Sequence, residues 1–290
     1  MTTFAIAAVQ MKAANGDNTE AMVGRIDTVM RTYPWVQMVV FGELLAKGFD
    51  LANAQPLPGP GESAFRDAAR RHGIWLVPGS AYIRDGNQVF NTASVIDPRG
   101  EVVARYRKIF PFRPYEAGVA AGDEVCTFDV PGVARFGLGI CYDKWFPETT
   151  RQMVWDGAEV IVQPTMTTTI DRDVELSIVR GLAAMNQCYF VDVNNAGELG
   201  VGRSIICGPE GDIVHQFGAD DEVAPVVIDL DRVRRVRRIG MHGLGQVLKS
   251  ARDSAAWFPA FQRERPASPT LDALGPLVMP HQRDISAAGS

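Results

Sequence analysis

The sequence has little of what a metal centre or a disulfide framework requires. It contains only four histidines and four cysteines in 290 residues, and it has no CxxC pair. No histidine lies at ligand spacing to a cysteine or to another histidine, so we expect no bound metal. Because the cysteines are widely spaced, they fit a reducing compartment better than a set of disulfides, and this predicts a cytoplasmic protein.

Long apolar runs and an excess of positive charge are also missing. No apolar stretch reaches 18 residues, so no membrane span is expected, and residues 3–10 are typical of a core strand rather than a signal peptide. The net charge of −5 argues against a nucleic-acid partner. The one basic run, at 231–238, predicts a solvated helix with Val233 and Val236 turned inward. The glycines near 194–202 lack the spacing of a phosphate-binding loop, so we expect no cofactor.

Strand and helix patterns alternate along most of the chain. Apolar runs predict strands, and amphipathic periodicity predicts helices between them. The expected strands are 4–10, 36–41, 74–83, 91–96, 102–107, 133–141, 159–163, 189–193, 204–207 and 212–217. The expected helices are 18–32, 62–72, 147–157 and 174–187.

Two β-hairpins share a Pro-x-Gly turn, one at residues 97–100 and one at 208–211. A hairpin within each αβ alternation predicts a mixed sheet in each half of the chain. Two such sheets packed face to face, with helices outside, give a four-layer α-β-β-α sandwich. We expect one domain over residues 1–263. Residues 264–290, rich in Pro, Ser and Ala, are expected to form an extended tail that is either mobile or packed on a partner subunit.

Three polar residues follow predicted strands and together suggest an active centre. Cys141 ends the run at 133–141, Glu43 follows strand 36–41, and Lys108 follows strand 102–107. A thiol on a strand-to-helix turn is held rigidly, as a nucleophile requires. Read alone, Cys141 could equally be a small buried apolar residue, Lys108 could lie on a solvated strand edge, and Glu43 could cap a turn.

The three groups suit nucleophilic attack on a carbon bonded to nitrogen. Lys108 and the helix expected from Pro147 would lower the pKa of the Cys141 thiol. Glu43 is the candidate general base, and Lys108 with the backbone N–H of Tyr142 would stabilise an oxyanion. Such chemistry forms a thioester and needs neither metal nor histidine.

Five motifs in order resemble the nitrilase, or carbon–nitrogen hydrolase, superfamily over roughly residues 3–245. They are FGE at 41–43, YRKI at 106–109, GICYDKWFPE at 139–148, RGLAAMN at 180–186 and GPEGDI at 208–213. The resemblance implies an α-β-β-α fold, frequent dimerisation and a Glu-Lys-Cys triad, here Glu43, Lys108 and Cys141. It also implies that Glu116 is the second glutamate of the family, although its surroundings are equally typical of a plain turn.

Two departures from the family pattern bear on the substrate. Gly42 replaces the proline that usually precedes the first glutamate. Trp145 occupies a position where branches that accept ω-amides of dicarboxylates commonly have arginine. Tyr and Asp follow Cys141, as in the amidase-like branches, so an amide is favoured over a nitrile. Residue types predict an uncharged pocket for a neutral or aromatic acyl group, lined by Tyr115, Tyr142, Trp145, Thr165 and Met166.

The sequence therefore predicts a cysteine-dependent amidohydrolase that releases ammonia from a small carboxamide. A nitrilase and an N-carbamoyl amidohydrolase remain alternatives with the same triad. An acyltransferase would use the same thioester with an amine in place of water, and a non-catalytic interaction module could keep the fold alone. The expected partners are a small amide substrate and a second copy of the chain, as a homodimer or higher oligomer.

Overall fold

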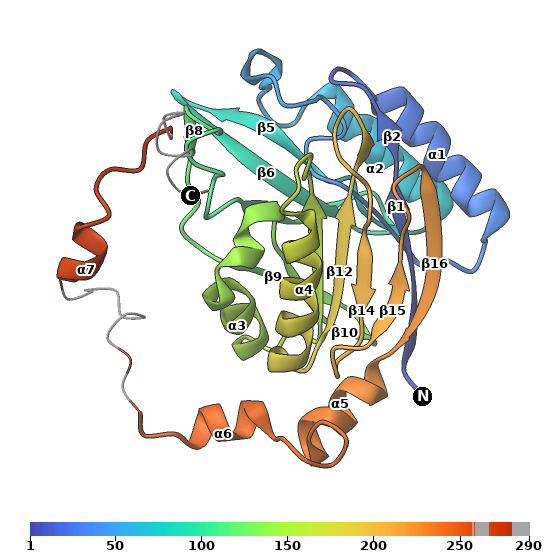
Figure 1. Ribbon diagram of the computed structural model, residues 1–290. Helices are drawn as coiled ribbons and strands as arrows, with labels where there is room; N and C mark the ends of the chain where they lie inside the picture. The colour runs from blue at the N-terminus through green and yellow to red at the C-terminus, as the bar shows by residue number, and fades with distance from the viewer. Residues whose placement is uncertain (257, 259–266, 280–290) are drawn as a thin grey trace.

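The computed structural model describes residues 1–256, 258 and 267–279, and it shows two mixed β-sheets between two pairs of helices (Figure 1). The predicted four-layer α-β-β-α sandwich is confirmed. None of the helices in the described ranges is long and apolar enough to cross a membrane.

The first sheet contains strands from the start, middle and end of the body. Its order is β16-β1-β3-β4-β6-β5, and β7 and β8 also pair with β6. Strand β1 runs parallel to β3 and antiparallel to β16. The bounds are β1 Thr3–Gln10, β3 Met38–Phe41, β4 Trp75–Val77, β5 Ser80–Asp85, β6 Gln88–Ile96, β7 Val102–Arg107, β8 Val119–Ala120 and β16 Glu222–Asp229.

The second sheet has the order β15-β14-β12-β11-β10-β9, with β10, β11 and β12 parallel. A short parallel pair, β2 with β13, joins the two halves of the chain. The bounds are β2 Lys12–Ala13, β9 Cys126–Val130, β10 Ala134–Leu138, β11 Val160–Thr165, β12 Tyr189–Asn194, β13 Ala196–Gly197, β14 Ile205–Cys207 and β15 Ile213–Gln216.

Helices α1 and α2 cover the first sheet, and α3 and α4 cover the second (Figure 1). Helix α5 follows β16 and buries Val233 and Val236, as predicted for the basic run. The bounds are α1 Thr19–Thr32, α2 Pro60–His72, α3 Pro147–Trp155, α4 Arg172–Asn186, α5 Leu230–Ile239, α6 Val247–Asp253 and α7 Pro269–Asp272, with 3₁₀ helices η1 Leu51–Asn53 and η2 Cys141–Trp145.

Alternate residues of β1 explain how the layers hold together. Phe4 and Ile6 point into the core between the two sheets, whereas Ala7 and Val9 pack against the layer of α1 and α2. A strand buried on both faces is apolar along its whole length, because successive side chains point to opposite sides. Three apolar clusters, between the sheets and under each helix pair, therefore account for the four layers.

Two of the predicted strands end or divide where the backbone turns. The run 74–83 is two strands, β4 and β5, because Pro78 and Gly79 break it. At Gly79 φ is +82°, and a Cβ there would lie 1.8 Å from the Gly42 carbonyl oxygen. The strand expected at 133–141 ends at Leu138. Strands β9 and β16 were not predicted.

The C-terminal region follows a different course from the layers. Helix α7 lies apart from the sandwich in Figure 1, and its residues are exposed. Of the expected tail, residues 264–266 and 280–290 lie outside the described residues. Whether the tail packs on a partner subunit stays a prediction.

Candidate active site

Glu43, Lys108 and Cys141 follow β3, β7 and β10 and line one buried cavity. The Lys108 ammonium donates to Glu43 at 2.7 Å and to Glu116 at 2.7 Å. Cys141 Sγ lines the same cavity and donates to the Met166 carbonyl oxygen at 3.9 Å. The structure thus brings together the four residues that the sequence singles out as catalytic.

Asn91, which the sequence did not reveal as a site residue, links the two glutamates. Its Nδ2 donates to Glu43 Oε1 at 2.8 Å and to Glu116 Oε1 at 3.0 Å. Glu116 also accepts from the Phe112 backbone N–H at 2.6 Å and from the Tyr82 hydroxyl at 3.2 Å. Glu116 is therefore fixed on several sides, which favours a positioning role over the plain-turn alternative.

The nucleophile candidate lies in a constrained backbone. Cys141 has φ of +43°, which is unusual for a residue with a side chain, and it begins η2. Gln163 Nε2 donates to the Cys141 carbonyl oxygen at 3.1 Å. Gly139 leaves room for this amide, because a Cβ there would lie 2.3 Å from Gln163 Oε1.

Glu43, the candidate base, is also held through its backbone carbonyl group by a side-chain amide. Asn195 Nδ2 donates to the Glu43 carbonyl oxygen at 2.7 Å. At Gly42 a Cβ would lie 2.1 Å from Asn195 Oδ1, so a side chain at this position would displace Asn195 from Glu43. The departure at Gly42 is thus accounted for by a close approach of Asn195.

Asp143 ties the nucleophile turn to the lysine segment. Its carboxylate accepts from the Ile140 N–H at 3.0 Å, the Phe110 N–H at 2.9 Å and the Tyr106 hydroxyl at 2.7 Å. Tyr106 and Phe110 flank Lys108, and Ile140 precedes Cys141. Asp143 therefore connects the two segments that carry the amine and the thiol. Burial raises the pKa of Asp143 to about 6.

Burial dominates the electrostatics of the cavity. It raises the pKa of the Cys141 thiol well above its usual value, and the charge of Glu43 adds to this effect. The predicted lowering by Lys108 and a helix is therefore wrong: Lys108 does oppose the shift, but burial outweighs it, and α3 begins only at Pro147. The thiol consequently keeps its proton until a base removes it.

The pKa values of Glu43 and Lys108 shift in directions that suit proton transfer. Burial and the charge of Glu116 raise the pKa of Glu43, against the opposing effect of Lys108. Burial alone would lower the pKa of Lys108, but the charges of Glu43, Cys141 and Glu116 raise it well above its usual value. Lys108 therefore stays cationic.

A second charged cluster, missed by the sequence analysis, lies behind the nucleophile turn. It consists of four buried residues, Lys144, Arg172, Glu175 and Asp192. Lys144 Nζ is 2.7 Å from Asp192 and 3.3 Å from Glu175, and Arg172 is 2.9 Å from Glu175. Its two cations and two carboxylates balance in charge. Lys144 lies three residues after Cys141 in the sequence, but its partners come from other elements.

The active-site hollow has two parts that share Cys141. The inner chamber has a volume of about 160 Å³ and includes Glu43, Lys108 and Glu116 in its lining. The outer chamber has a volume of about 590 Å³ and lies toward α4. The residues common to both are Phe49, Phe112, Tyr115, Cys141 and Met166.

Four of the five predicted pocket residues line these chambers. Tyr115 and Met166 line both, and Tyr142 and Trp145 line the outer one. Thr165 lines neither: it is fully buried, and its Oγ1 accepts from Lys144 at 3.0 Å. The expectation of a largely uncharged lining is also wrong for the outer chamber, because Asp171, Glu175 and Glu198 contribute carboxylates.

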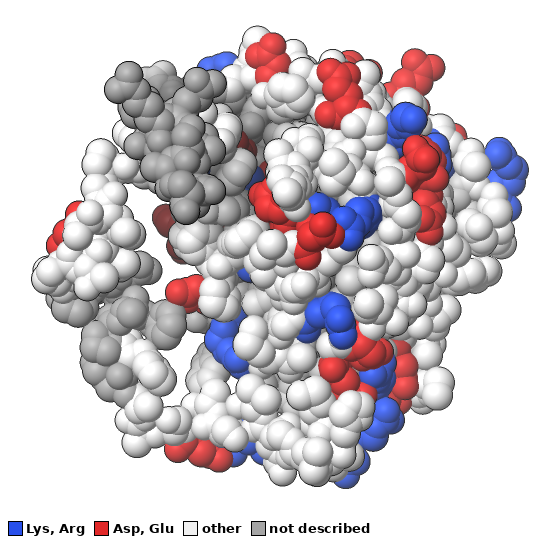
Figure 2. All heavy atoms as spheres, viewed as in Figure 1, with Lys and Arg blue, Asp and Glu red and all other residues white. Residues whose placement is uncertain are grey.

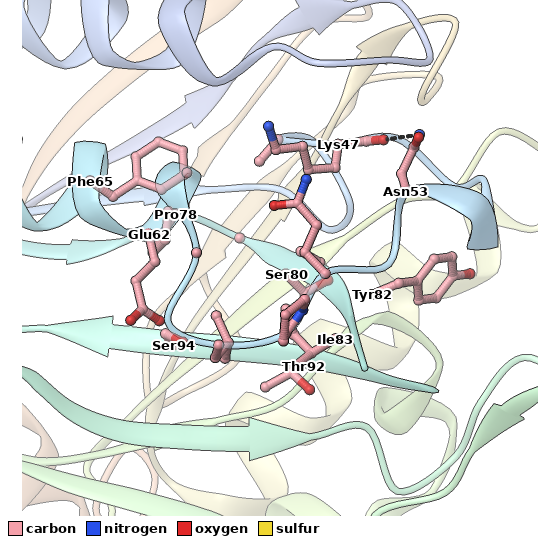
Figure 3. A pocket seen from close by; sticks show the side chains of 18 of the residues that line it. Lys47, Asn53, Glu62, Phe65, Pro78, Ser80, Tyr82, Ile83, Thr92 and Ser94 are labelled. Carbon is pink, nitrogen blue, oxygen red and sulfur yellow. Dashed lines mark hydrogen bonds between the residues drawn. The ribbon is translucent and has the colours of Figure 1, made fainter. Parts of the chain in front are cut away.

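Another cavity lies between β5, β6 and the segment leading into α2 (Figure 3). Phe65, Pro78 and Ile83 make much of its wall apolar, and Tyr82 is its one residue in common with the inner chamber. It contains none of Glu43, Lys108 and Cys141, so we place the chemistry in the two chambers.

Two further features could mark a competing site: a cluster of metal ligands and a basic surface patch. In the described ranges, no three His, Cys, Asp or Glu side chains group as metal ligands. On the face shown in Figure 2, Lys and Arg are interspersed with Asp and Glu, and they form no continuous basic patch there.

Known proteins resemble this chain in sequence and in fold. The family model described as "Carbon-nitrogen hydrolase" matches residues 5–238. The chain is 31% identical over 210 residues to a 2-oxoglutaramate amidase of Bacillus subtilis (strain 168), a match that covers 69% of this chain and 81% of that one. It is 27% identical over 219 residues to a formamidase of Bacillus thuringiensis (strain Al Hakam), covering 72% and 66%.

Solved structures show the same fold. Saccharomyces cerevisiae Nit3, a member of branch 10 of the nitrilase superfamily, superposes with a TM-score of 0.75 at 23% identity, covering 82% of this chain and 94% of that one. A cysteine-to-alanine mutant of the amidase from Nesterenkonia sp. AN1, in complex with butyramide, gives a TM-score of 0.70 at 25% identity, covering 81% and 94%.

Proposed function

Because this chain belongs to the carbon–nitrogen hydrolase family, whose relatives here are amidases acting on non-peptide bonds, we propose that it hydrolyses a carboxamide through a Cys141 thioester. The observation that carries this proposal is the inner chamber, where Lys108 contacts two carboxylates beside a protonated thiol. A buried, fixed cation is suited to stabilising the oxyanion of acyl transfer.

The first half of the reaction forms the thioester. Glu43 accepts the thiol proton as Cys141 Sγ attacks the carbonyl carbon. The oxyanion lies against the Lys108 ammonium and the Tyr142 backbone N–H. Glu43 then returns the proton to the amide nitrogen, the C–N bond breaks, and ammonia leaves. The raised pKa values of Glu43 and Cys141 support a base that removes the proton during attack.

The second half consumes water. Glu43 takes a proton from a water molecule as its oxygen attacks the thioester carbon. The C–S bond breaks, the carboxylic acid is released, and the proton on Glu43 returns to Cys141. Glu116 and Asn91 hold Lys108 and Glu43 in place through both halves.

The charged residues that line the chambers limit the class of substrate that can bind. Apart from Lys108, neither chamber has a Lys, Arg or His in its wall. A carboxylate tail such as that of 2-oxoglutaramate would therefore find no cation, although a 2-oxoglutaramate amidase is a relative. We propose that the substrate is a small carboxamide without an anionic tail, as formamide and butyramide are.

The test is hydrolysis of a substrate panel with detection of the acyl-enzyme. Ammonia release from butyramide should exceed that from 2-oxoglutaramate, and mass spectrometry should find the acyl mass on Cys141. Cys141→Ala should abolish turnover and keep the fold. Turnover near the wild-type rate in that variant would refute the assignment. Activity on butyronitrile but not butyramide would favour a nitrilase, and formation of an N-substituted amide with an added amine would favour acyl transfer.

A further inference from the structure

The outer chamber carries charge of one sign only. Asp171, Glu175 and Glu198 line it, and no Lys, Arg or His does. Glu175 is neutralised within the buried cluster by Arg172 at 2.9 Å and Lys144 at 3.3 Å. In the described part of the chain, Asp171 and Glu198 have no Lys or Arg within 4.0 Å, so they leave the chamber with a net negative charge.

Two cations in the elements around this chamber form ion pairs outside it. Lys144 is buried behind the wall, 2.7 Å from Asp192. Arg203 pairs with Asp173 at 2.5 Å. Neither can be turned into the chamber without breaking an ion pair. Both pairs hold these cations outside the lining, whose charged side chains are all acidic.

Aromatic rings supply an independent feature that favours a cation. Five of them line the chamber: Phe49, Phe112, Tyr115, Tyr142 and Trp145. The centroids of Phe112 and Tyr115 are 4.9 Å apart, those of Phe112 and Tyr142 4.9 Å, and those of Tyr142 and Trp145 6.2 Å, so they form a continuous wall. Aromatic faces attract ammonium and guanidinium groups through their quadrupole.

The indole of Trp145 also ties the aromatic wall to the acidic one. Its Nε1 donates to Glu175 Oε1 at 3.3 Å, while Glu175 Oε2 accepts from the Thr167 hydroxyl at 2.8 Å. Glu175 is buried and therefore held rigidly at the boundary between the two walls. An aromatic wall with two unpaired carboxylates beside it is a surface that recognises positive charge.

We propose that the outer chamber binds a positively charged group on the acyl chain, so the substrate class is a carboxamide with an ammonium or guanidinium tail. The proposal rests on the proposed function, since the inner chamber must hold the carboxamide against Cys141. It differs from the neutral or aromatic acyl group that the sequence predicts.

The experiment compares three amides with one chain length: 5-aminopentanamide with a cationic tail, hexanamide with a neutral tail, and the monoamide of glutaric acid with an anionic tail. The value of kcat/KM should be at least about tenfold higher for the cationic amide than for the neutral one, and lowest for the anionic one. Added salt should reduce the preference, because the outer carboxylates are solvent-accessible.

Variants identify the groups responsible. The double variant Asp171→Asn with Glu198→Gln should reduce the ratio of cationic to neutral kcat/KM by about tenfold. Both substitutions keep an oxygen that can accept from Thr169 and from the Asn15 N–H. Glu20→Gln, an exposed carboxylate on α1 outside both chambers, should leave the ratio as in the wild type.

The outcomes separate this inference from the proposed function. Hydrolysis of hexanamide with no preference for 5-aminopentanamide, or a preference that survives the double variant, overturns the cationic tail and leaves the amidase intact. No turnover of any of the three amides, with no acyl mass on Cys141, overturns the proposed function itself.

Discussion

At the scale of single residues, burial decides where the active-site protons lie. The Cys141 thiol and the Glu43 carboxyl both have raised pKa values, and Lys108 is kept cationic. A thiol that keeps its proton reacts more slowly with oxidants and alkylating agents at neutral pH than a thiolate does. Such an enzyme relies on the substrate and the base together to create the nucleophile.

The first prediction concerns pH. Glu43 must be ionised to act as a base, and its folded pKa lies above 4.5, so kcat/KM should fall as the pH drops toward that pKa. Asp143, with a pKa of about 6, loses an acceptor for three donors in the same range. The alkaline side should stay level to about pH 9, because Lys108 titrates much higher. The measurement is kcat/KM against pH with an uncharged amide. A preformed thiolate would instead give rapid iodoacetamide labelling at pH 5.

The second prediction concerns Lys108→Ala. Activity should fall by about 100- to 1000-fold if the ammonium stabilises the oxyanion. The free energy of unfolding should also fall, by about 3–5 kcal/mol, because two buried carboxylates lose their cation. Steady-state kinetics and urea denaturation measure the two effects. Lys12→Ala, which removes an exposed lysine, should change neither. A rate effect below about tenfold would point to a structural role for Lys108.

At the scale of elements, the site depends on how strand ends are braced against one another. Asp143 joins the turn after β10 to the segment after β7 through three hydrogen bonds. The amides of Gln163 and Asn195 hold the carbonyl groups of Cys141 and Glu43. None of these residues performs chemistry, but each limits the distance between groups that do.

The third prediction tests this bracing. Asp143→Asn keeps one side-chain oxygen as an acceptor but replaces the other with an NH₂ group, which is itself a donor. Donor would then face donor, so the turn after β10 and the segment after β7 should separate. We expect kcat to fall roughly 10- to 100-fold with little change in KM, because the misplaced groups act only in the transition state. Tyr106→Phe removes one of the three donors and should cost less. An Asp143→Asn enzyme with wild-type kcat would show that the brace is dispensable.

The elements most visible in the sequence are those with a strong local pattern. Helices α1 to α4 lie within a few residues of their predicted ranges, because each combines an apolar stripe with a clear start or stop. Strand β16 was missed because Pro225 interrupts its strand pattern in the sequence. The proline is tolerated in the structure because β16 lies at the edge of its sheet. The division between β4 and β5 depends on the approach of Gly79 to Gly42, which is a tertiary contact.

The same distinction applies to the site. Glu43, Lys108 and Cys141 could be found because each is a polar residue at the end of a predicted strand. Their convergence could not be read from strand pairing, because β3 and β7 lie in one sheet and β10 in the other. Asn91 and the cluster around Lys144 could not, because their partners are set by the packing of distant elements. Thr165 was misplaced because the pleat turns its side chain toward Lys144 and away from the cavity. The catalytic and binding roles of all these site residues stay predictions until the variants are measured.

At the scale of the whole molecule, the helix layer of α3 and α4 presents apolar side chains to solvent. Trp155, Val174 and Met185 are 61%, 49% and 46% exposed. Large exposed apolar side chains on one layer of a protein are a common feature of subunit interfaces. We propose that this layer pairs two copies of the chain, as the family resemblance implies.

The fourth prediction is therefore that the chain is a homodimer in solution. Trp155→Glu should weaken association, because it places a charge in the proposed interface. Sedimentation velocity over a range of concentrations measures the effect. Trp35→Glu is a matched control, since Trp35 is 48% exposed but lies after α1, on the opposite helix layer. A monomeric wild-type protein at micromolar concentration would contradict the proposal.

The pairing of β1 with β16 also has a consequence for biosynthesis. The partner of residues 3–10, at 222–229, is translated roughly 210 residues after them. At about 5–20 residues per second, β1 waits about 10–40 s with one edge open. A nascent chain of this kind should need chaperone protection, and truncation before β16 should yield aggregates rather than a partly active enzyme.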